Sequence, residues 1–134
     1  MSETIPWDAL FEVASASRER AYAPYSKFLV GAAALFDDGT ISPGCNVENA
    51  TYGLTVCAER NAIGRAVGEG KQKLKAVAVV VDSREPCPPC GMCRQVMAEF
   101  AGPDLPVRMR DLKGREASYT LGDLLPHAFT KSFL

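Results

Sequence analysis

Apolar residues recur at helical spacing in the first part of the chain. Within residues 6–21, Trp7 and Leu10 begin an apolar series that fits a period of 3.6 residues per turn. Asp8 near the start of this segment and basic side chains near its end complement the dipole of such a helix. The pattern predicts a helix over residues 6–21, and Pro24 is expected to end it.

Three later apolar runs have the character of strands. Residues 28–36 and 41–47 are separated by turn-forming residues at positions 37–40, so the two runs predict a hairpin. Residues 76–81 are almost continuously apolar, which is typical of a central strand that is buried on both faces.

The remaining pattern completes an α/β fold. Residues 56–67 predict a helix rich in small residues, and residues 91–101 predict another helix with one apolar side. Two short strands, residues 107–111 and 116–120, are joined by so brief a connection that an antiparallel pair is favoured. The order of elements predicts one mixed sheet with helices on its faces. Residues 1–134 have the length of a single domain.

Composition and charge narrow the possible partners and the compartment. With 47% hydrophobic and 23% charged residues, the chain is typical of a globular protein. A formal net charge of −1 offers no basic field for nucleic acid, and no apolar stretch approaches the ~20 residues that span a bilayer. We expect a cytoplasmic protein, in which the five cysteines are thiols or metal ligands rather than disulfides.

Cysteine and glutamate residues form two short blocks, each at the start of a predicted helix. Cys57 and Glu59 are two residues apart, and Cys90 and Cys93 are three apart. Three cysteine ligands leave the fourth position of a tetrahedral zinc open to water, as in catalytic rather than structural sites. Glu59 is a natural base for that water, provided that Cys57 lies at or before the helix start and Glu59 in the first turn.

The other cysteines and the only histidine admit alternatives. Adding Cys87 to the three ligands would make a closed structural zinc site and favour a zinc-stabilised binding module. Prolines 88 and 89 fix an extended backbone, which should leave Cys87 outside the helical turn and outside the ligand set. We expect Cys45 to be a small core residue in its strand and His127 to be structural.

Four blocks of the sequence together resemble the cytidine deaminase family of the short-chain kind. They are residues 25–28, 44–50, 57–63 and 89–95, in the order of the family pattern, and the similarity covers nearly the whole chain. The resemblance implies a three-layer α/β/α fold with a mixed five-stranded sheet and one Zn²⁺ per chain. It also implies that Glu59 carries protons during deamination and that Arg60 hydrogen-bonds the zinc thiolates.

The resemblance also implies a substrate pocket. Asn46 and Glu48 are two apart on a predicted strand, so their side chains leave the same face, and the family uses them to bind the ribose, chiefly its 3′-hydroxyl. We expect their polar groups to be unpaired unless a sugar hydroxyl reaches them. Phe28 would contact the pyrimidine, and backbone groups near Ala58 and Pro89 would contact the base.

Short-chain members of the family share their active sites between subunits, which implies a homotetramer. Phe129 resembles a residue that such members lend to a neighbouring subunit's pocket, and Tyr52 is a second candidate for a shared site. The expected activity is zinc-dependent conversion of cytidine and deoxycytidine to uridine and deoxyuridine in pyrimidine salvage. The rivals are a deaminase of a cytosine-bearing antibiotic such as blasticidin S, an editing enzyme of RNA or DNA, and the closed zinc module.

Overall fold

Five strands and four α-helices make up the part of the chain that the computed structural model describes, residues 4–134. The strands are β1 (Val30–Phe36), β2 (Ile41–Cys45), β3 (Leu74–Val81), β4 (Pro106–Arg110) and β5 (Glu116–Thr120). The helices are α1 (Trp7–Arg18), α2 (Ala58–Gly68), α3 (Gly91–Phe100) and α4 (Leu121–Leu124), with 3₁₀ turns at Tyr52–Leu54 and Lys131–Phe133.

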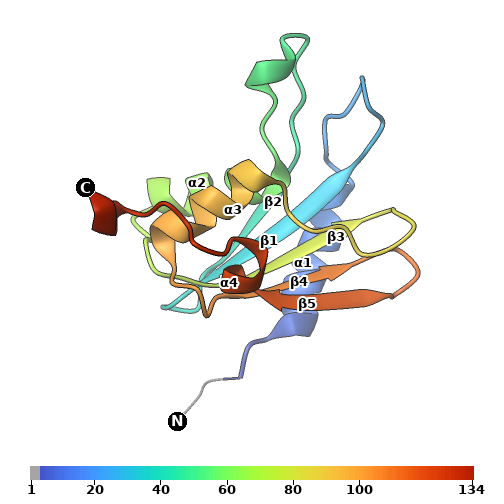
Figure 1. Ribbon diagram of the computed structural model, residues 1–134. Helices are drawn as coiled ribbons and strands as arrows, with labels where there is room; N and C mark the ends of the chain where they lie inside the picture. The colour runs from blue at the N-terminus through green and yellow to red at the C-terminus, as the bar shows by residue number, and fades with distance from the viewer. Residues whose placement is uncertain (1–3) are drawn as a thin grey trace.

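The strands form one mixed sheet in the order β2-β1-β3-β4-β5, in which β3 is central (Figure 1). Strand β1 pairs antiparallel with β2 and β3, whereas β3 and β4 are parallel and β4 and β5 antiparallel. The only parallel connection among them passes through α3, as a crossover between parallel strands requires. The predicted mixed five-stranded sheet is confirmed.

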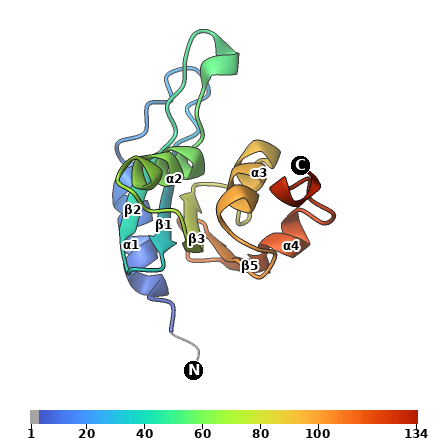
Figure 2. The ribbon, with the colours of Figure 1, turned by 90° about the vertical axis from the view of Figure 1, so that its left-hand side faces the viewer.

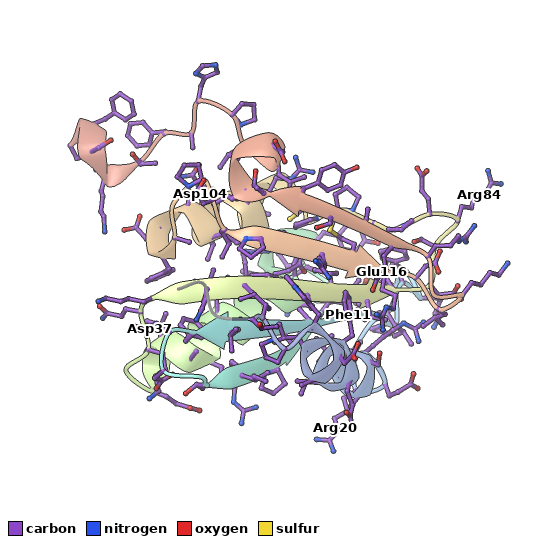
Figure 3. The ribbon with its side chains drawn as sticks, turned by 90° about the horizontal axis from the view of Figure 1, so that it is seen from below. Phe11, Arg20, Asp37, Arg84, Asp104 and Glu116 are labelled. Carbon is purple, nitrogen blue, oxygen red and sulfur yellow. The ribbon has the colours of Figure 1, made fainter. Side chains whose placement is uncertain are left out.

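Helices cover both faces of the sheet, so the molecule has three layers (Figure 2). On β3, alternate residues such as Ala78 and Val80 join a core with Leu10 and Phe11 of α1. Figure 3 shows α1, with Phe11 labelled, lying against this face. The intervening residues, such as Val77 of β3, join a larger core with α2 and α3. This alternation is the two-residue period of a strand buried on both faces.

Small residues allow α2 to lie directly on the edge strand. A Cβ atom built on Gly44 of β2 would lie 2.3 Å from the Ala58 carbonyl oxygen, so only glycine permits this approach. Ala58 and Ala62 are both fully buried on the same face of α2. The close contact fixes the first turn of α2, where Cys57 and Glu59 lie.

Several predicted element boundaries differ from the structure because tertiary pairing overrides the local pattern. Helix α1 ends at Arg18, well before Pro24, because the backbone of Tyr22 pairs with the segment after β2: its N–H bonds Asn46 O at 3.0 Å. Strand β2 ends at Cys45, not at residue 47, and α2 begins at Ala58, not at residue 56. Between them, the Val47 and Val56 backbones pair with each other at 2.9 Å. Helix α4 and both 3₁₀ turns were not predicted.

Two loops project together from one end of the sheet. They connect α1 to β1 and β2 to α2, and both extend in the same direction in Figures 1 and 2. Tyr25 of the first loop contacts Tyr52 of the second, with ring centroids 6.0 Å apart. Within residues 4–134, no helix is long and apolar enough to cross a membrane.

Candidate active site

Two helices are each preceded by a cysteine at the N-cap position. Cys57 is the N-cap of α2 and Cys90 is the N-cap of α3, each with extended backbone angles and with no capping hydrogen bond from its side chain. Cys93 lies in the first turn of α3 and is fully buried. Glu59 lies in the first turn of α2. This is the placement that the spacing of the two blocks requires if the four side chains are to converge.

The three thiols form a compact cluster. The Sγ atoms of Cys57, Cys90 and Cys93 all lie within 4.8 Å of one another. The Cys57–Cys90 distance is 3.5 Å and the Cys90–Cys93 distance is 3.4 Å. Zinc–sulfur bonds of about 2.3 Å in a tetrahedron place sulfur atoms about 3.8 Å apart, so the cluster fits one zinc ion.

Cys87 does not join this cluster. Its Sγ atom faces the Pro88 carbonyl oxygen at 3.6 Å, and the group of metal-ligating atoms found within residues 4–134 contains only the other three thiols. A closed four-thiolate site is therefore not formed. The expectation that the two prolines keep Cys87 out of the ligand set agrees with this geometry.

Hydrogen bonds within the cluster polarise its thiols. The pKa of Cys57 is lowered to about 5, chiefly by the hydrogen bond from Cys93, with further contributions from the nearby Arg60 guanidinium. The pKa of Cys93 is raised for the complementary reason. Arg60 Nη2 lies 3.8 Å from Cys57 Sγ and donates to Thr55 O at 3.1 Å. Within the cluster, Cys57 is therefore the thiol whose ionised form is favoured.

Glu59 is a buried carboxylate beside the thiols. Only 4% of the residue is exposed, and it lines the same cavity as Cys57 and Cys90. Burial raises the pKa of its carboxyl to about 7, and the charge of Cys57 adds to the shift. A carboxyl with a pKa near neutrality can both accept and return a proton.

The cavity has a volume of about 180 Å³ and lies between the sheet and the starts of α2 and α3. Of the residues predicted for the substrate pocket, Phe28, Asn46 and Ala58 line it, and Pro89 is buried directly before Cys90. Members that the sequence reasoning missed are Val30, Thr55, Val79, Val81, Cys87 and Pro88. The apolar alternation of β3 signals buried valines but not which of them face a cavity.

Asn46 already has protein partners. Its Oδ1 accepts from the Val30 N–H at 2.9 Å, and its Nδ2 donates to the Phe28 carbonyl at 2.8 Å. The expectation that this side chain is unpaired in the absence of a substrate is therefore wrong. The reason is that the Val30 N–H at the start of β1 and the Phe28 carbonyl before it both bond to the amide.

Glu48 also has protein partners, and it lies outside the cavity. Its Oε1 accepts from the Tyr25 and Ser26 N–H groups at 3.0 and 3.1 Å, and its Oε2 accepts from the Ser26 hydroxyl. It lines a neighbouring hollow of about 390 Å³ together with Tyr52 and Thr55. Thr55 borders both spaces, so the hollow adjoins the cavity.

The C-terminal candidates lie away from the cavity. Phe129 is 61% exposed and stacks on Phe133, with ring centroids 5.9 Å apart. Gln95 of α3 donates to its carbonyl at 2.7 Å. His127 is exposed and takes a positive φ of 55°. Cys45 is half-buried and lines a surface groove between α1 and α2, so the expectation that it is a core residue is wrong.

The geometry defines a class of protein: a three-layer α/β/α domain in which three thiols are clustered as for one zinc ion beside a buried carboxyl group. Comparison of the chain with known proteins identifies one family. The family model described as cytidine and deoxycytidylate deaminase zinc-binding region matches residues 7–109, and the chain belongs to this family.

Similar proteins support this membership over most of the chain. A cytidine deaminase of Sporosarcina psychrophila is 53% identical over 118 residues, which are 88% of this chain and 87% of that protein. One of Halalkalibacterium halodurans is 51% identical over 90% of this chain and 92% of its own length. The crystal structure of a Burkholderia pseudomallei cytidine deaminase has a TM-score of 0.89 and 49% identity, covering 93% of this chain and all of that chain. A blasticidin-S deaminase of Bacillus cereus is 33% identical over 92% of this chain and 91% of its own length.

Proposed function

We propose that this protein is a zinc-dependent deaminase that hydrolyses cytidine and deoxycytidine to uridine and deoxyuridine and releases ammonia. The observation that carries the proposal is the convergence of Glu59 with the thiols of Cys57 and Cys90 in one cavity. The relatives named cytidine deaminases, at 51% and 53% identity, support the choice of substrate.

Cys57, Cys90 and Cys93 would hold one zinc ion per chain. Thiolates are soft donors that zinc prefers, and a set of three leaves one position for a reactant. When bound, zinc supplies a Lewis acid that lowers the pKa of water toward neutrality.

Positive charge around the thiolates supports that acidity. Three thiolates more than balance the charge of one zinc ion, and the resulting negative charge would oppose removal of a proton from water. The N-termini of α2 and α3 each present the positive end of a helix dipole to the cluster. Arg60 adds a full charge, with its Nη2 at 3.8 Å from Cys57 Sγ. Its Nε–H is buried without a partner, so the guanidinium has donor capacity left for the thiolate charge.

Glu59 moves the protons. It accepts a proton from the attacking water and donates one to N3 of the pyrimidine, which makes C4 electrophilic. The water oxygen then bonds to C4 as a hydroxyl group. Glu59 takes the remaining proton from this hydroxyl and gives it to the amino nitrogen, the bond from C4 to that nitrogen breaks, and the product keeps a C4 carbonyl and the proton on N3. One water is consumed and one ammonia is released, so Glu59 ends in the protonation state in which it began.

The remaining pocket residues bind the nucleoside. Phe28 packs against the pyrimidine, and backbone groups near Ala58 and Pro89 contact the base. Asn46 and Glu48 bind the ribose through the hydrogen-bonding positions that their protein partners do not occupy. An amide can form four hydrogen bonds and a carboxylate about four, whereas the structure uses two of Asn46 and three of Glu48. These existing bonds hold both side chains in place before substrate arrives.

The active form is a homotetramer with shared active sites, acting in the cytoplasm in pyrimidine salvage. Tyr52 is 75% exposed and contacts Tyr25, and Phe129 is 61% exposed and stacks on Phe133. Exposed apolar clusters of this kind mark interaction sites. Tyr52 also lines the hollow that adjoins the cavity and contains Glu48, so a chain that packs on Tyr52 would close this part of the site. Phe129 is the residue proposed to enter the neighbouring site. Sedimentation that shows a fully active monomer at assay concentration would refute this arrangement.

An ultraviolet assay of the purified protein tests the proposed substrate class. Cytidine and deoxycytidine should both react, since each carries a 3′-hydroxyl, and free cytosine should react poorly. Glu48→Ala should then lower kcat/KM for the nucleosides far more than for cytosine. Equal efficiency with cytosine and cytidine would instead identify a base deaminase. Turnover of blasticidin S without turnover of cytidine would identify an antibiotic deaminase.

A further inference from the structure

The Cys87 thiol lies in the wall of the substrate cavity but outside the metal cluster. It lines the same space as Asn46 and the buried Glu59 carboxylate, and it is half-buried. It belongs to the loop that joins β3 to α3, residues 82–90. Figure 3 shows Arg84 of this loop at the end of the sheet opposite Asp37 of the β1–β2 turn. Because Cys87 lies outside the three-thiol cluster, zinc coordination does not explain the position of its side chain.

The chemistry fixes two edges of a bound pyrimidine. Deamination at C4 requires that C4 face the thiolate cluster, and protonation of N3 requires that N3 face Glu59. Glu59 belongs to α2, the helix that follows Cys57. In the ring, C5 lies on the other side of C4 from N3. The C5 edge therefore faces a part of the cavity wall that Glu59 does not form. The segment that precedes Cys90, which includes Cys87, lines this cavity as well.

The cavity wall near Cys87 suits that edge. C5 and C6 carry only hydrogen atoms in cytidine, so this edge needs apolar contacts. Val79 and Val81 of β3 are almost fully buried and line the same cavity, and the Cys87 thiol behaves as a small apolar group. The polar residues that line the cavity, Asn46, Thr55 and Glu59, belong to other segments of the chain than β3 and the loop that carries Cys87.

We propose that Cys87 forms the wall against the C5 edge of the pyrimidine and limits which C5 substituents the enzyme accepts. The inference rests on the proposed function, because it assumes a cytosine nucleoside in this cavity. It makes Cys87 a specificity-determining residue and a thiol that bound nucleoside covers.

Protection from alkylation tests the position of the thiol. The zinc-loaded protein is treated with N-ethylmaleimide, with or without saturating uridine, and the modified cysteines are identified by mass spectrometry. Uridine should slow alkylation of Cys87 at least about tenfold, as expected for a group buried under a ligand. Cys45 is the internal control, because it is half-buried in a separate groove and its alkylation should be unchanged. Equal alkylation of Cys87 with and without uridine would overturn the inference.

Substitution tests the specificity. Cys87→Ala enlarges the proposed wall, and Cys87→Leu narrows it. The ratio of kcat/KM for 5-bromocytidine to that for cytidine should rise about tenfold in Cys87→Ala and fall in Cys87→Leu, a range typical of a changed apolar pocket. Cys45→Ala should leave the ratio unchanged. An unaltered ratio in both Cys87 variants would refute the inference while leaving deamination of cytidine, and hence the proposed function, intact.

Discussion

Two carboxylates are buried within residues 4–134, and their pKa values shift in opposite directions. Glu59 in the first turn of α2 is 4% exposed, and Asp111 at the β4–β5 turn is 2% exposed. The pKa of Glu59 is raised to about 7, whereas that of Asp111 is lowered. Burial alone cannot explain the difference, because it acts on both groups in the same direction.

The difference lies in the partners that each carboxylate meets. Burial also opposes the charge of Asp111, but its Oδ1 accepts from the Lys113 N–H at 2.9 Å and the Arg115 N–H at 3.0 Å. The Arg115 guanidinium pairs with its other oxygen. Glu59 lies instead beside the lowered-pKa thiol of Cys57, whose negative charge adds to the cost of burial. Asp111 thus stabilises a turn in its charged form, whereas the charge of Glu59 costs folding energy.

A costly buried carboxylate is expected where it does chemistry. Active sites commonly hold groups whose environment pushes their pKa toward neutrality, at the expense of stability. The contrast with Asp111 therefore supports the proposed role of Glu59 independently of the motif. It also predicts that similar substitutions at the two sites have unlike effects.

The largest expected effect concerns the metal beside Glu59. Cys90→Ala should lower the zinc content well below one per chain and abolish turnover, because two thiolates do not hold the ion in the required geometry. Cys87→Ala is the matched control, since it removes a thiol from the same cavity but not from the cluster. Zinc content is measured by atomic emission on dialysed protein. Equal metal loss in the two variants would overturn the ligand assignment.

Glu59→Gln should retain zinc and the fold but lose about 10²–10⁴-fold in turnover, the usual contribution of a positioned acid–base group. Glu69→Gln makes the same change near the other end of α2, on an exposed residue, and should leave turnover nearly unchanged. Steady-state assays with cytidine on zinc-loaded proteins measure both. Turnover within a few-fold of the unmodified protein in Glu59→Gln would refute the proton transfer assigned here.

Local sequence patterns could predict the metal cluster because the relevant spacings are short. Glu59 is the second residue after Cys57 and Cys93 is the third after Cys90, and a helix start fixes the directions of such neighbours. The order of the elements and the central strand could also be predicted, since hydrophobic periodicity reports burial. The two short sequence blocks therefore contain the three clustered cysteines and Glu59.

The surroundings of the cluster could not be predicted in the same way. Asn46 bonds to backbone groups 16 and 18 residues earlier, one at the start of β1 and one in the loop before it, and Glu48 bonds to loop groups 22 and 23 residues earlier. No local pattern encodes such partners. For the same reason, the place of Cys87 in the cavity wall and the early end of α1 depend on tertiary pairing, which sequence spacing does not report.

The stability effects of the two carboxylates should have opposite signs in metal-free protein at pH 8. Asp111→Asn should lower the melting temperature by several degrees, because it removes the charged acceptor of the turn. Glu59→Gln should raise the free energy of unfolding by on the order of 1–3 kcal/mol, since the pKa rise from 4.5 to about 7 makes the ionised form costly. Urea denaturation in the presence of a chelator measures both. If both variants lower the free energy of unfolding, the ionised Glu59 carboxylate does not destabilise the fold.

The smallest effect is the pH dependence of these differences. The folded-state pKa of Asp111 lies below its ordinary value of 3.8, so its stabilising contribution is complete above that pH and is lost as the pH falls through the folded-state pKa. The stability gap between the unmodified protein and Asp111→Asn should therefore shrink below about pH 4.

For Glu59 the pKa is raised, so the favourable protonated form persists below pH 4.5 and its advantage is lost as the pH rises toward about 7. The gain from Glu59→Gln should accordingly be absent at pH 4.5 and develop by pH 7. Denaturation curves of metal-free proteins across this range measure both trends, and a gap for Asp111→Asn that is as large at pH 3 as at pH 6 would show that the ionised carboxylate does not stabilise the turn.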